Sequence, residues 1–356
     1  MVQKNNFMKR AGARGDSRLA RVMTAIVMMF TLAVSGAWAQ EPTKYTVAMG
    51  AEAGEGWTIA PAEATTTGVD KDTKITATYS GGRHVKSVTA VVKAAAPAVS
   101  YDKTVSINDG AVTVTAGEHW LITGTGMATS NQITISDGAT VTLDGVNISG
   151  SSYCIKCEGS ATIILKDGST NLLTSTSTNY PALWIGNAGT TMTIQGSTGA
   201  LTVQSGQWCA GIGGGYNNTN NICGNIKIEG GVITATGGQY AAGIGSDCGQ
   251  ANCGNIDITG GTIVATGGAN AAGIGSGHGG EATASCGNIT IKKTVTSVTA
   301  TKGSNAPNSI GAGDGSNASC GTVTIGGTVY WDGSAYKNGG DTYLTTSPLI
   351  YQPSSN

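Results

Sequence analysis

The sequence predicts an all-β protein, with a right-handed parallel β-helix of about six to seven coils as its main part and a small N-terminal β module before it. Three features lead to this fold class: a repeat of about 30 residues, apolar residues at every second position, and 56 glycines among 356 residues. Alternation with a period of two is typical of strands with one buried face. Short units that bury little surface alone become stable when they stack.

The repeat is clearest at four cysteines, Cys223, Cys253, Cys286 and Cys320, which are 30, 33 and 34 residues apart. Each is followed by glycine and then by an alternating apolar pair, which predicts a short strand, and two more strands follow glycine turns. The pairs of the first strand are Ile226/Ile228, Ile256/Ile258, Ile289/Ile291 and Val323/Ile325, those of the second are Ile233/Ala235 and Ile263/Ala265, and those of the third are Ala210/Ile212, Ala242/Ile244 and Ala272/Ile274. We expect Ile133/Ile135, Ile163/Leu165 and Met192/Ile194 to continue the first series upstream.

Other repeat architectures fit these units less well. A propeller blade needs about 40 residues, and a leucine-rich repeat needs a leucine framework that is absent from the sequence. Both phenylalanines, Phe7 and Phe30, precede the repeats, so the core is expected to consist of small aliphatic side chains. The right-handed sense follows from the general preference of parallel crossovers.

The first 39 residues have the features of an export signal. Six basic residues precede or begin an apolar run over residues 22–34, and Ala-Trp-Ala at residues 37–39 has the small residues of a cleavage site. We therefore expect an exported protein, located in the periplasm, at the cell surface or outside the cell. The run is too short for a stable membrane span, so no span is expected in the mature chain.

Charge and composition argue against nucleic acid as a partner. Residues 1–39 contain six of the 20 basic residues and one of the 21 acidic residues, which leaves 14 basic and 20 acidic residues after cleavage. Phosphate binding needs clustered Lys and Arg, and the remaining chain has no such cluster.

The chain is expected to have further segments around the β-helix. Residues 41–93 contain four short alternating segments, and Trp-Thr-Ile-Ala-Pro at residues 57–61 and Thr-Tyr-Ser-Gly at residues 78–81 resemble divergent internalin-type B-repeats of secreted bacterial surface proteins. The resemblance implies a spacer module. A linker is expected over residues 94–104, the β-helix over residues 105–330, and a C-terminal cap or tail over residues 331–356.

Two columns of polar residues accompany the repeat. Asn225, Asn255 and Asn288 occupy the same place in successive units, and we expect their amides to satisfy backbone groups along the stack. The cysteine column has Cα spacings within disulfide range, but parallel side chains are expected to hold the Cβ atoms slightly too far apart. Cys248 and Cys253 share one loop and are therefore the first disulfide candidate.

Aromatic residues point to a candidate sugar-binding surface. If residues 182–185 align with residues 241–244, Leu183 and Ile185 point inward and Trp184 points outward. Trp208 and Tyr240 occupy matching places, and Tyr216 lies in the adjoining loop, so the four rings are expected to form a strip that stacks on carbohydrate. The alternatives are that these rings cover glycine-rich backbone or form a dimer contact.

The sequence does not predict an active site. β-Helix hydrolases need two or three clustered carboxylates, and lyases need acids that hold calcium beside a basic residue. Acidic residues are scattered over residues 105–330, no arginine is present there, and His119 and His278 stand alone in the sequence. We therefore expect no enzyme activity, although a polysaccharide lyase or hydrolase stays an alternative.

The coil sequences resemble a known family. Ala-Ala-Gly-Ile-Gly at residues 241–245 and 271–275, with Gly-Gly-x-Ile-x-Ala-Thr-Gly-Gly at residues 230–238 and 260–268, resembles secreted bacterial carbohydrate-binding β-helix domains. The resemblance covers about residues 101–330 and implies binding of polysaccharide or glycan, including acidic pectic chains, with calcium in some members.

Calcium is the one cofactor to consider, and Asp247 and Asp314 are its candidate ligands because both lie in glycine-rich loops. Residues 105–330 contain 11 acidic and six basic residues, so an acidic polymer would need a bridging cation. The expectation is a non-catalytic exported glycan-binding protein. A structural or adhesive surface protein that binds another protein is the remaining alternative.

Overall fold

The computed structural model describes residues 57–60, 74–79, 86–91, 99–216, 222–249 and 251–353. The chain divides into two compact units, residues 1–99 and 100–356, and the division falls inside the range expected for the linker. The expected export signal lies outside the described residues, and so does the first of the four alternating segments, Tyr-Thr-Val at residues 45–47.

The first unit contains a small antiparallel sheet in the order β1-β2-β3. Its strands are β1 (Trp57–Ala60), β2 (Lys74–Tyr79) and β3 (Lys86–Val91). They correspond to three of the four alternating segments that the sequence contains between residues 41 and 93.

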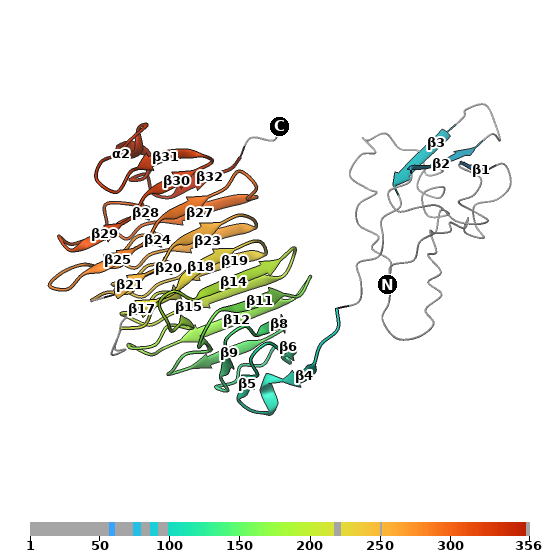
Figure 1. Ribbon diagram of the computed structural model, residues 1–356, viewed down its shortest axis with the longest axis horizontal. Helices are drawn as coiled ribbons and strands as arrows, with labels where there is room; N and C mark the ends of the chain where they lie inside the picture. Colours follow the sequence, from blue (N-terminus) through green and yellow to red (C-terminus); the bar gives the residue numbers. More distant parts are fainter. Residues whose placement is uncertain are drawn as a thin grey trace. The chain divides into compact units, whose positions relative to one another are not determined.

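The second unit is a parallel β-helix, which Figure 1 shows as strands stacked from the green N-terminal coils to the red C-terminal end. Three long sheets run along the stack. The ten-stranded sheet contains β4 (Lys103–Ser106), β6 (His119–Thr123), β8 (Thr140–Asp144), β11 (Ala161–Leu165), β14 (Thr191–Gly196), β18 (Asn225–Ile228), β22 (Ile256–Ile258), β26 (Ile289–Ile291), β30 (Val323–Ile325) and β31 (Thr328–Trp331). The seven-stranded sheet contains β9 (Asn147–Gly150), β12 (Thr170–Ser175), β15 (Ala200–Gln204), β19 (Val232–Thr236), β23 (Thr262–Thr266), β27 (Ser297–Thr301) and β32 (Leu349–Tyr351). The eight-stranded sheet contains β5 (Val112–Val114), β7 (Ile133–Ile135), β10 (Ile155–Cys157), β13 (Leu183–Ile185), β16 (Ile212–Gly213), β20 (Ile244–Gly245), β24 (Ile274–Gly275) and β28 (Ile310–Gly311).

One strand from each long sheet forms a coil, and the predicted β-helix is confirmed. The complete coils are β8-β9-β10, β11-β12-β13, β14-β15-β16, β18-β19-β20, β22-β23-β24 and β26-β27-β28. Two shorter turns, which contain β4, β5, β6 and β7, precede them, with the short 3-10 helix η4 (Ile107–Asp109) after β4.

Isoleucine meets isoleucine along the interior, as the repeat predicts. Ile194, Ile228 and Ile258 are partners on neighbouring strands, and the column continues from Ile163 to Ile325. All of these side chains are at most 2% exposed. Each coil therefore closes the apolar face of the next, which a single unit could not do alone.

The predicted upstream continuation of the first strand series is partly wrong. Ile133 and Ile135 lie on β7 in the eight-stranded sheet, where their partners are Ile155 and Cys157. Met192 and Ile194 do continue the series, because their partners are Ile226 and Ile228, whereas Ile163 pairs with Ile194 and not with Met192. Period-two alternation shows which side chains share a face, but it does not show which of three sheets a strand joins.

The cysteine repeat forms a fourth sheet that the three-strand pattern did not predict. Its strands are β17 (Ile222–Cys223), β21 (Ala251–Cys253), β25 (Ala284–Cys286) and β29 (Ala318–Cys320), all parallel. This sheet is present only in the C-terminal coils.

The C-terminal segment covers the last strands of two long sheets. β31 pairs antiparallel with β30, and β32 pairs antiparallel with β27. Between them lies the short helix α2 (Gly340–Tyr343), after which Leu344 and Leu349 are each 1% exposed. Antiparallel strands at this end block further edge-to-edge pairing. Within the described residues, no helix has the length and apolar character needed to cross a bilayer.

Candidate functional site

Aromatic side chains gather at the eight-stranded sheet: Trp184 lies on β13, and the others lie in the turns that enter its strands and the loops that leave them. Three contacts between ring centroids define this surface: Tyr180 to Trp184 at 5.5 Å, Trp208 to Tyr216 at 4.8 Å, and Tyr240 to His278 at 5.7 Å. We call these six residues the aromatic strip. It contains the four aromatic residues expected from the sequence, of which Trp208, Tyr216 and Tyr240 are partly open to solvent and Trp184 is covered.

Trp208 and Tyr240 occupy matching places in successive coils, as expected. The Tyr240 backbone N–H donates to the Gln207 carbonyl at 3.1 Å, and the Gln207 side-chain amide donates to Gln239 Oε1 at 3.2 Å. The Trp208, Tyr216 and Tyr240 side chains are half-buried. Part of each side chain is thus open to solvent.

In the next two coils, the positions that match Trp208 and Tyr240 hold asparagine amides instead of rings. The Asn270 N–H donates to the Gln239 carbonyl, which places Asn270 in register with Tyr240. Asn305 follows, and its Nδ2 donates to Asn270 Oδ1 at 2.7 Å. Rings suit the C–H faces of sugars, and amides suit their hydroxyl groups, because an amide both donates and accepts hydrogen bonds.

Trp184 differs from the other rings because it is only 7% exposed. The Tyr153 ring lies 5.8 Å away and the Lys156 Nζ lies 5.0 Å from its centroid. Trp184 was expected to present its ring outward on the strip, but the structure covers it. Tyr180, which is 37% exposed, is the accessible ring in this coil.

The strand register explains why a large ring fits at Trp184. Its partner on the next strand is Gly213, which is followed by Gly245 and Gly275. The sequence alignment placed Leu183 opposite Ala242, whereas the strands place it in the column of Ile244, so the alignment was shifted by two residues. A shift of two keeps the inward and outward faces unchanged. In the later coils the fourth sheet packs near this column, and glycine replaces the ring.

His278 does not stand alone, although the sequence suggested that it did. Its Nδ1 lies 3.4 Å from Asp314 Oδ2, without a hydrogen bond between them, and its ring contacts Tyr240. The residues are 36 positions apart in sequence, so only the stacking of coils shows the pair. His119, the other histidine of the β-helix, lies at the opposite end, where it contacts Thr142 at 2.9 Å.

Asp247 is fully buried, and neither of its carboxylate oxygens has a hydrogen-bond partner. Burial raises the pKa of this carboxyl well above its usual range. The thiols of Cys209, Cys248 and Cys253 are the ionisable groups that sense its charge. A neutral carboxylic acid among thiols is the form that this environment favours.

The donor sets do not fit the expected calcium ion. Calcium takes six to eight oxygen ligands, whereas Asp247 has sulfur neighbours and Asp314 faces a histidine. Among the described residues, no group of three or more His, Cys, Asp or Glu side chains gathers at one point.

The expected disulfide between Cys248 and Cys253 is not formed. All eight cysteines lie in the described part of the chain and are free thiols. The Cys248 sulfur contacts the Trp208 carbonyl at 3.8 Å, whereas the Cys253 sulfur faces Cys223. A shared loop did not bring the two thiols together because Cys253 is held on β21 by its pairing with β17.

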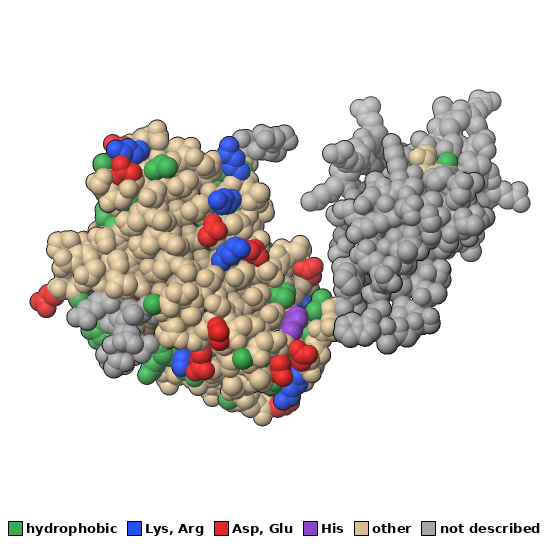
Figure 2. Space-filling model, in the orientation of Figure 1, with side chains coloured by type: hydrophobic (Ala, Val, Ile, Leu, Met, Phe, Trp, Pro, Cys, Tyr) green, Lys and Arg blue, Asp and Glu red, His purple; other side chains and the backbone are tan. Residues whose placement is uncertain are grey.

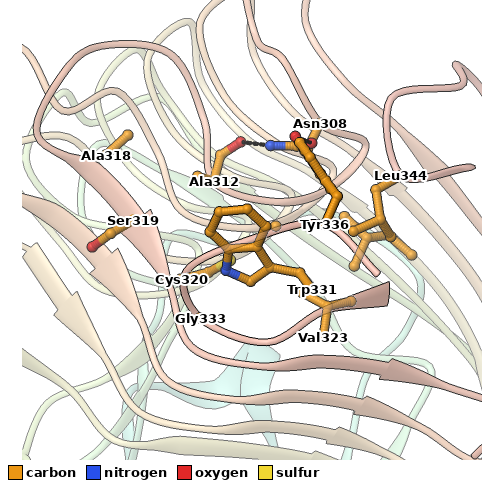
Figure 3. A pocket seen from close by; sticks show the side chains of 12 residues that line it. Asn308, Ala312, Ala318, Ser319, Cys320, Val323, Trp331, Gly333, Tyr336 and Leu344 are labelled. Atoms are coloured by element: carbon orange, nitrogen blue, oxygen red, sulfur yellow. Dashed lines mark hydrogen bonds between the residues drawn. The ribbon is translucent and has the colours of Figure 1, made fainter. Parts of the chain in front are cut away.

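A cavity of about 240 Å³ lies at the C-terminal end of the stack, beside the last strands of the eight-stranded and four-stranded sheets. Figure 3 shows the Trp331 indole at the centre of its lining. The Tyr336 hydroxyl donates to Asn308 Oδ1 at 2.7 Å, and Asn308 Nδ2 donates to the Ala312 carbonyl at 3.1 Å. Cys320 also lines the cavity.

Charged side chains are sparse on the β-helix. On the face seen in Figure 2, most of the surface is backbone or side chains that are neither charged nor hydrophobic, and the Lys, Asp and Glu side chains are dispersed over it. Several of the charges are paired, such as Lys156 with Glu158 at 3.0 Å. Such a surface offers hydrogen bonds rather than a strong field.

Comparison of the chain with family models, with curated proteins and with solved structures gives no match. The functional assignment therefore depends on the geometry and chemistry of the strip.

Proposed function

We propose that this chain is an exported, non-catalytic glycan-binding protein that binds polysaccharide along the aromatic strip. The observation that carries the proposal is the repetition of half-buried rings in successive coils, with Trp208 beside Tyr216 and then Tyr240 in the matching place. Neighbouring strands are about 4.8 Å apart, so rings at matching places in successive coils follow the stack axis.

The chemistry of the strip favours carbohydrate over an apolar partner. A sugar presents C–H faces that stack on rings and hydroxyl groups that need hydrogen bonds. Asn270 and Asn305 extend the ring column with amides, which both donate and accept. Asn270 is only 8% exposed and accepts from Asn305, so the exposed Asn305 is the amide that a sugar hydroxyl can reach. A protein partner would instead favour a continuous apolar patch. The exposed apolar side chains that share a register column on the seven-stranded sheet, Leu172, Val264 and Ile350, are separated by the threonines Thr202, Thr234 and Thr299.

One observation favours the enzymatic alternative. His278, Asp314 and Tyr240 lie close together beside the strip, and a histidine next to a carboxylate is a common proton-transfer arrangement. No second carboxylate joins this group among the described residues. We therefore place glycan binding first and treat cleavage as the alternative that the same experiment measures.

The test is retention of the purified chain on a panel of immobilised polysaccharides, including pectic polymers, neutral plant polymers and mucin glycans. Each polymer is tested with calcium and with chelator, and the supernatant is analysed for released fragments. We expect retention on at least one polymer without fragments. Loss of retention with chelator would show a cation bridge to an acidic polymer, whereas released fragments would support the enzymatic alternative.

The matched variants are Trp208→Ala with Tyr240→Ala on the strip, and Tyr101→Ala as a half-buried aromatic control away from it. Removal of two stacking rings should weaken binding roughly tenfold or more. The control should bind like the parent chain. Unchanged retention of the double variant, with an unchanged unfolding midpoint, would refute the strip as the binding surface.

A further inference from the structure

The fourth sheet carries a ladder of four cysteines, one in each of the last four coils. Cys223 is the register partner of Cys253, Cys253 of Cys286, and Cys286 of Cys320. The Cys223, Cys253 and Cys286 side chains are at most 5% exposed, whereas Cys320 is half-buried. Four thiols thus follow one another along the stack at the spacing of neighbouring strands, which lies within the Cα range of disulfides.

Successive thiols of the ladder do not interact with one another equally. The Cys223 and Cys253 sulfurs are 2.7 Å apart, about 0.7 Å longer than a disulfide bond. In the second pair, hydrogen bonding between the thiols raises the pKa of Cys286 and lowers the pKa of Cys320. The Cys253 sulfur is turned toward Cys223, and its effect on the pKa of Cys286 is electrostatic. The ladder is therefore two pairs rather than one uniform row.

Glycines opposite the ladder leave room for the sulfur atoms. A Cβ atom on Gly214 would lie 3.4 Å from the Cys223 Cβ, and one on Gly311 would lie 3.6 Å from the Cys320 sulfur. Gly214 and Gly311 thus place no side chain of their own against Cys223 and Cys320, and the nearest other side chains beside them are Asp247 and Asn308.

We propose that the ladder closes into two disulfides, Cys223–Cys253 and Cys286–Cys320, when the chain meets a disulfide oxidant. Each bond joins two successive coils of the stack. In each reaction two thiols lose two protons and two electrons and form one S–S bond, while the oxidant's S–S bond breaks and yields two thiols. This modification is independent of the proposed glycan binding.

Cys320 is the entry point for the second pair in the folded chain. It lines the cavity at the end of the stack, where a disulfide oxidant can reach its sulfur. Its lowered pKa increases the thiolate fraction, and the thiolate is the attacking species. The resulting mixed disulfide is then resolved by Cys286, its hydrogen-bonded neighbour. The Cys223–Cys253 pair is buried and is expected to close during folding.

The experiment uses the full chain, folded from denaturant once with glutathione disulfide and once with a reductant. Remaining thiols are alkylated after unfolding, and the chain is cleaved at basic and at acidic residues for mass spectrometry. We expect two cross-linked species, Cys223 with Cys253 and Cys286 with Cys320. Because Cys248 and Cys253 fall in one fragment, the parent is compared with Cys248→Ser, which should give the same two species.

A matched pair of variants tests the pairing. In Cys223→Ser, Cys253 should be found alkylated while Cys286 and Cys320 still cross-link. In Cys320→Ser, Cys286 should be found alkylated while Cys223 and Cys253 still cross-link. Cys154 and Cys157, which are buried away from the ladder, should be alkylated throughout. A Cys253–Cys286 or Cys248–Cys253 bond, or complete alkylation of the ladder after oxidation, would overturn the proposal.

The oxidised chain should also unfold at a higher urea concentration than the reduced chain. The shift should disappear when all four ladder cysteines are replaced by serine, since linking coils restricts the unfolded chain. A shift of equal size in that variant would show that the oxidant acts elsewhere.

Discussion

The N-terminal and C-terminal coils of the β-helix share one interior but differ in size. Val112, Ile133 and Ile155 are in register on successive coils and are 21 and 22 residues apart. In the later coils, the register partners Ile212, Ile244, Ile274 and Ile310 are 32, 30 and 36 residues apart. The extra residues do not thicken the interior. They form the fourth sheet and the loops around it.

The two regions therefore use different means to hold neighbouring coils together. The N-terminal coils contain larger side chains, such as Trp120, Leu143 and Leu165, in the core. The C-terminal coils add repeated small or polar residues on the outside of the apolar column. Asn225 Oδ1 accepts from the Asn255 N–H at 2.9 Å, and Asn255 Oδ1 accepts from the Asn288 N–H at 2.8 Å. Regular repeats allow such ladders because each coil presents the same atoms to the next.

The register column of glycines in the eight-stranded sheet, Gly213, Gly245, Gly275 and Gly311, belongs to the C-terminal coils. Substitution in this glycine column should cause the largest loss of stability. A Cβ atom on Gly245 would lie 1.9 Å from the Gly275 carbonyl oxygen, and its φ is +136°. We expect Gly245→Ala to lower the free energy of unfolding by about 4 kcal/mol. Gly168→Ala, at φ +74° in open space, should cost about 1 kcal/mol. Urea unfolding followed by circular dichroism measures both, and equal losses would contradict a special role of the column.

Truncation of a buried isoleucine should lower the free energy of unfolding by the same amount in the N-terminal and the C-terminal coils. Ile163 and Ile258 belong to the same column and are fully buried. Each change to Ala should cost about 3 kcal/mol, because each leaves a cavity in a packed core. Val264→Ala, at a position 36% exposed, should cost less than about 0.5 kcal/mol. A much smaller loss at Ile258 than at Ile163 would show that the outer ladders, rather than the core, hold the C-terminal coils.

Each asparagine of the ladder should contribute less to the free energy of unfolding than a buried isoleucine does. Asn255→Ala removes the acceptor of the Asn288 N–H and should cost about 1 to 2 kcal/mol. Asn255→Asp keeps an acceptor oxygen and should recover part of the loss. The exposed Asn252 offers a control, and its change to Ala should be nearly neutral. The outcome against the ladder would be equal unfolding midpoints for Asn255→Ala and Asn252→Ala.

The smallest expected effect is a loss of stability due to the buried Asp247, which is absent at acidic pH and grows as the pH rises. Burial raises the pKa of Asp247, so the folded chain keeps a proton that the unfolded chain loses above about pH 3.9. Stability should therefore fall as the pH rises from this value through the raised pKa. Asp247→Asn is neutral at every pH and should remove this part of the decline. Urea midpoints over a pH series test it, and parallel curves for parent and variant would refute it.

The sequence alone determined the repeat, the inward faces of the strands and the role of the asparagines. Each depends on a pattern that recurs within one unit: the alternation of Ile226 and Ile228, or an Asn after each Cys-Gly. The observed partners of Ile226 and Asn255 follow directly from aligning the units. Local periodicity is sufficient here because stacking repeats the same contact.

Only the tertiary structure decided which side chains meet between different parts of a coil. The cover over Trp184, the neighbouring His278 and Asp314, and the partner of Cys253 all depend on how sharply each turn bends and how far each loop returns. Those features vary with loop length from coil to coil, so alternation gives no information about them. Residues that are 30 or more positions apart become neighbours only when the sheets have taken their places.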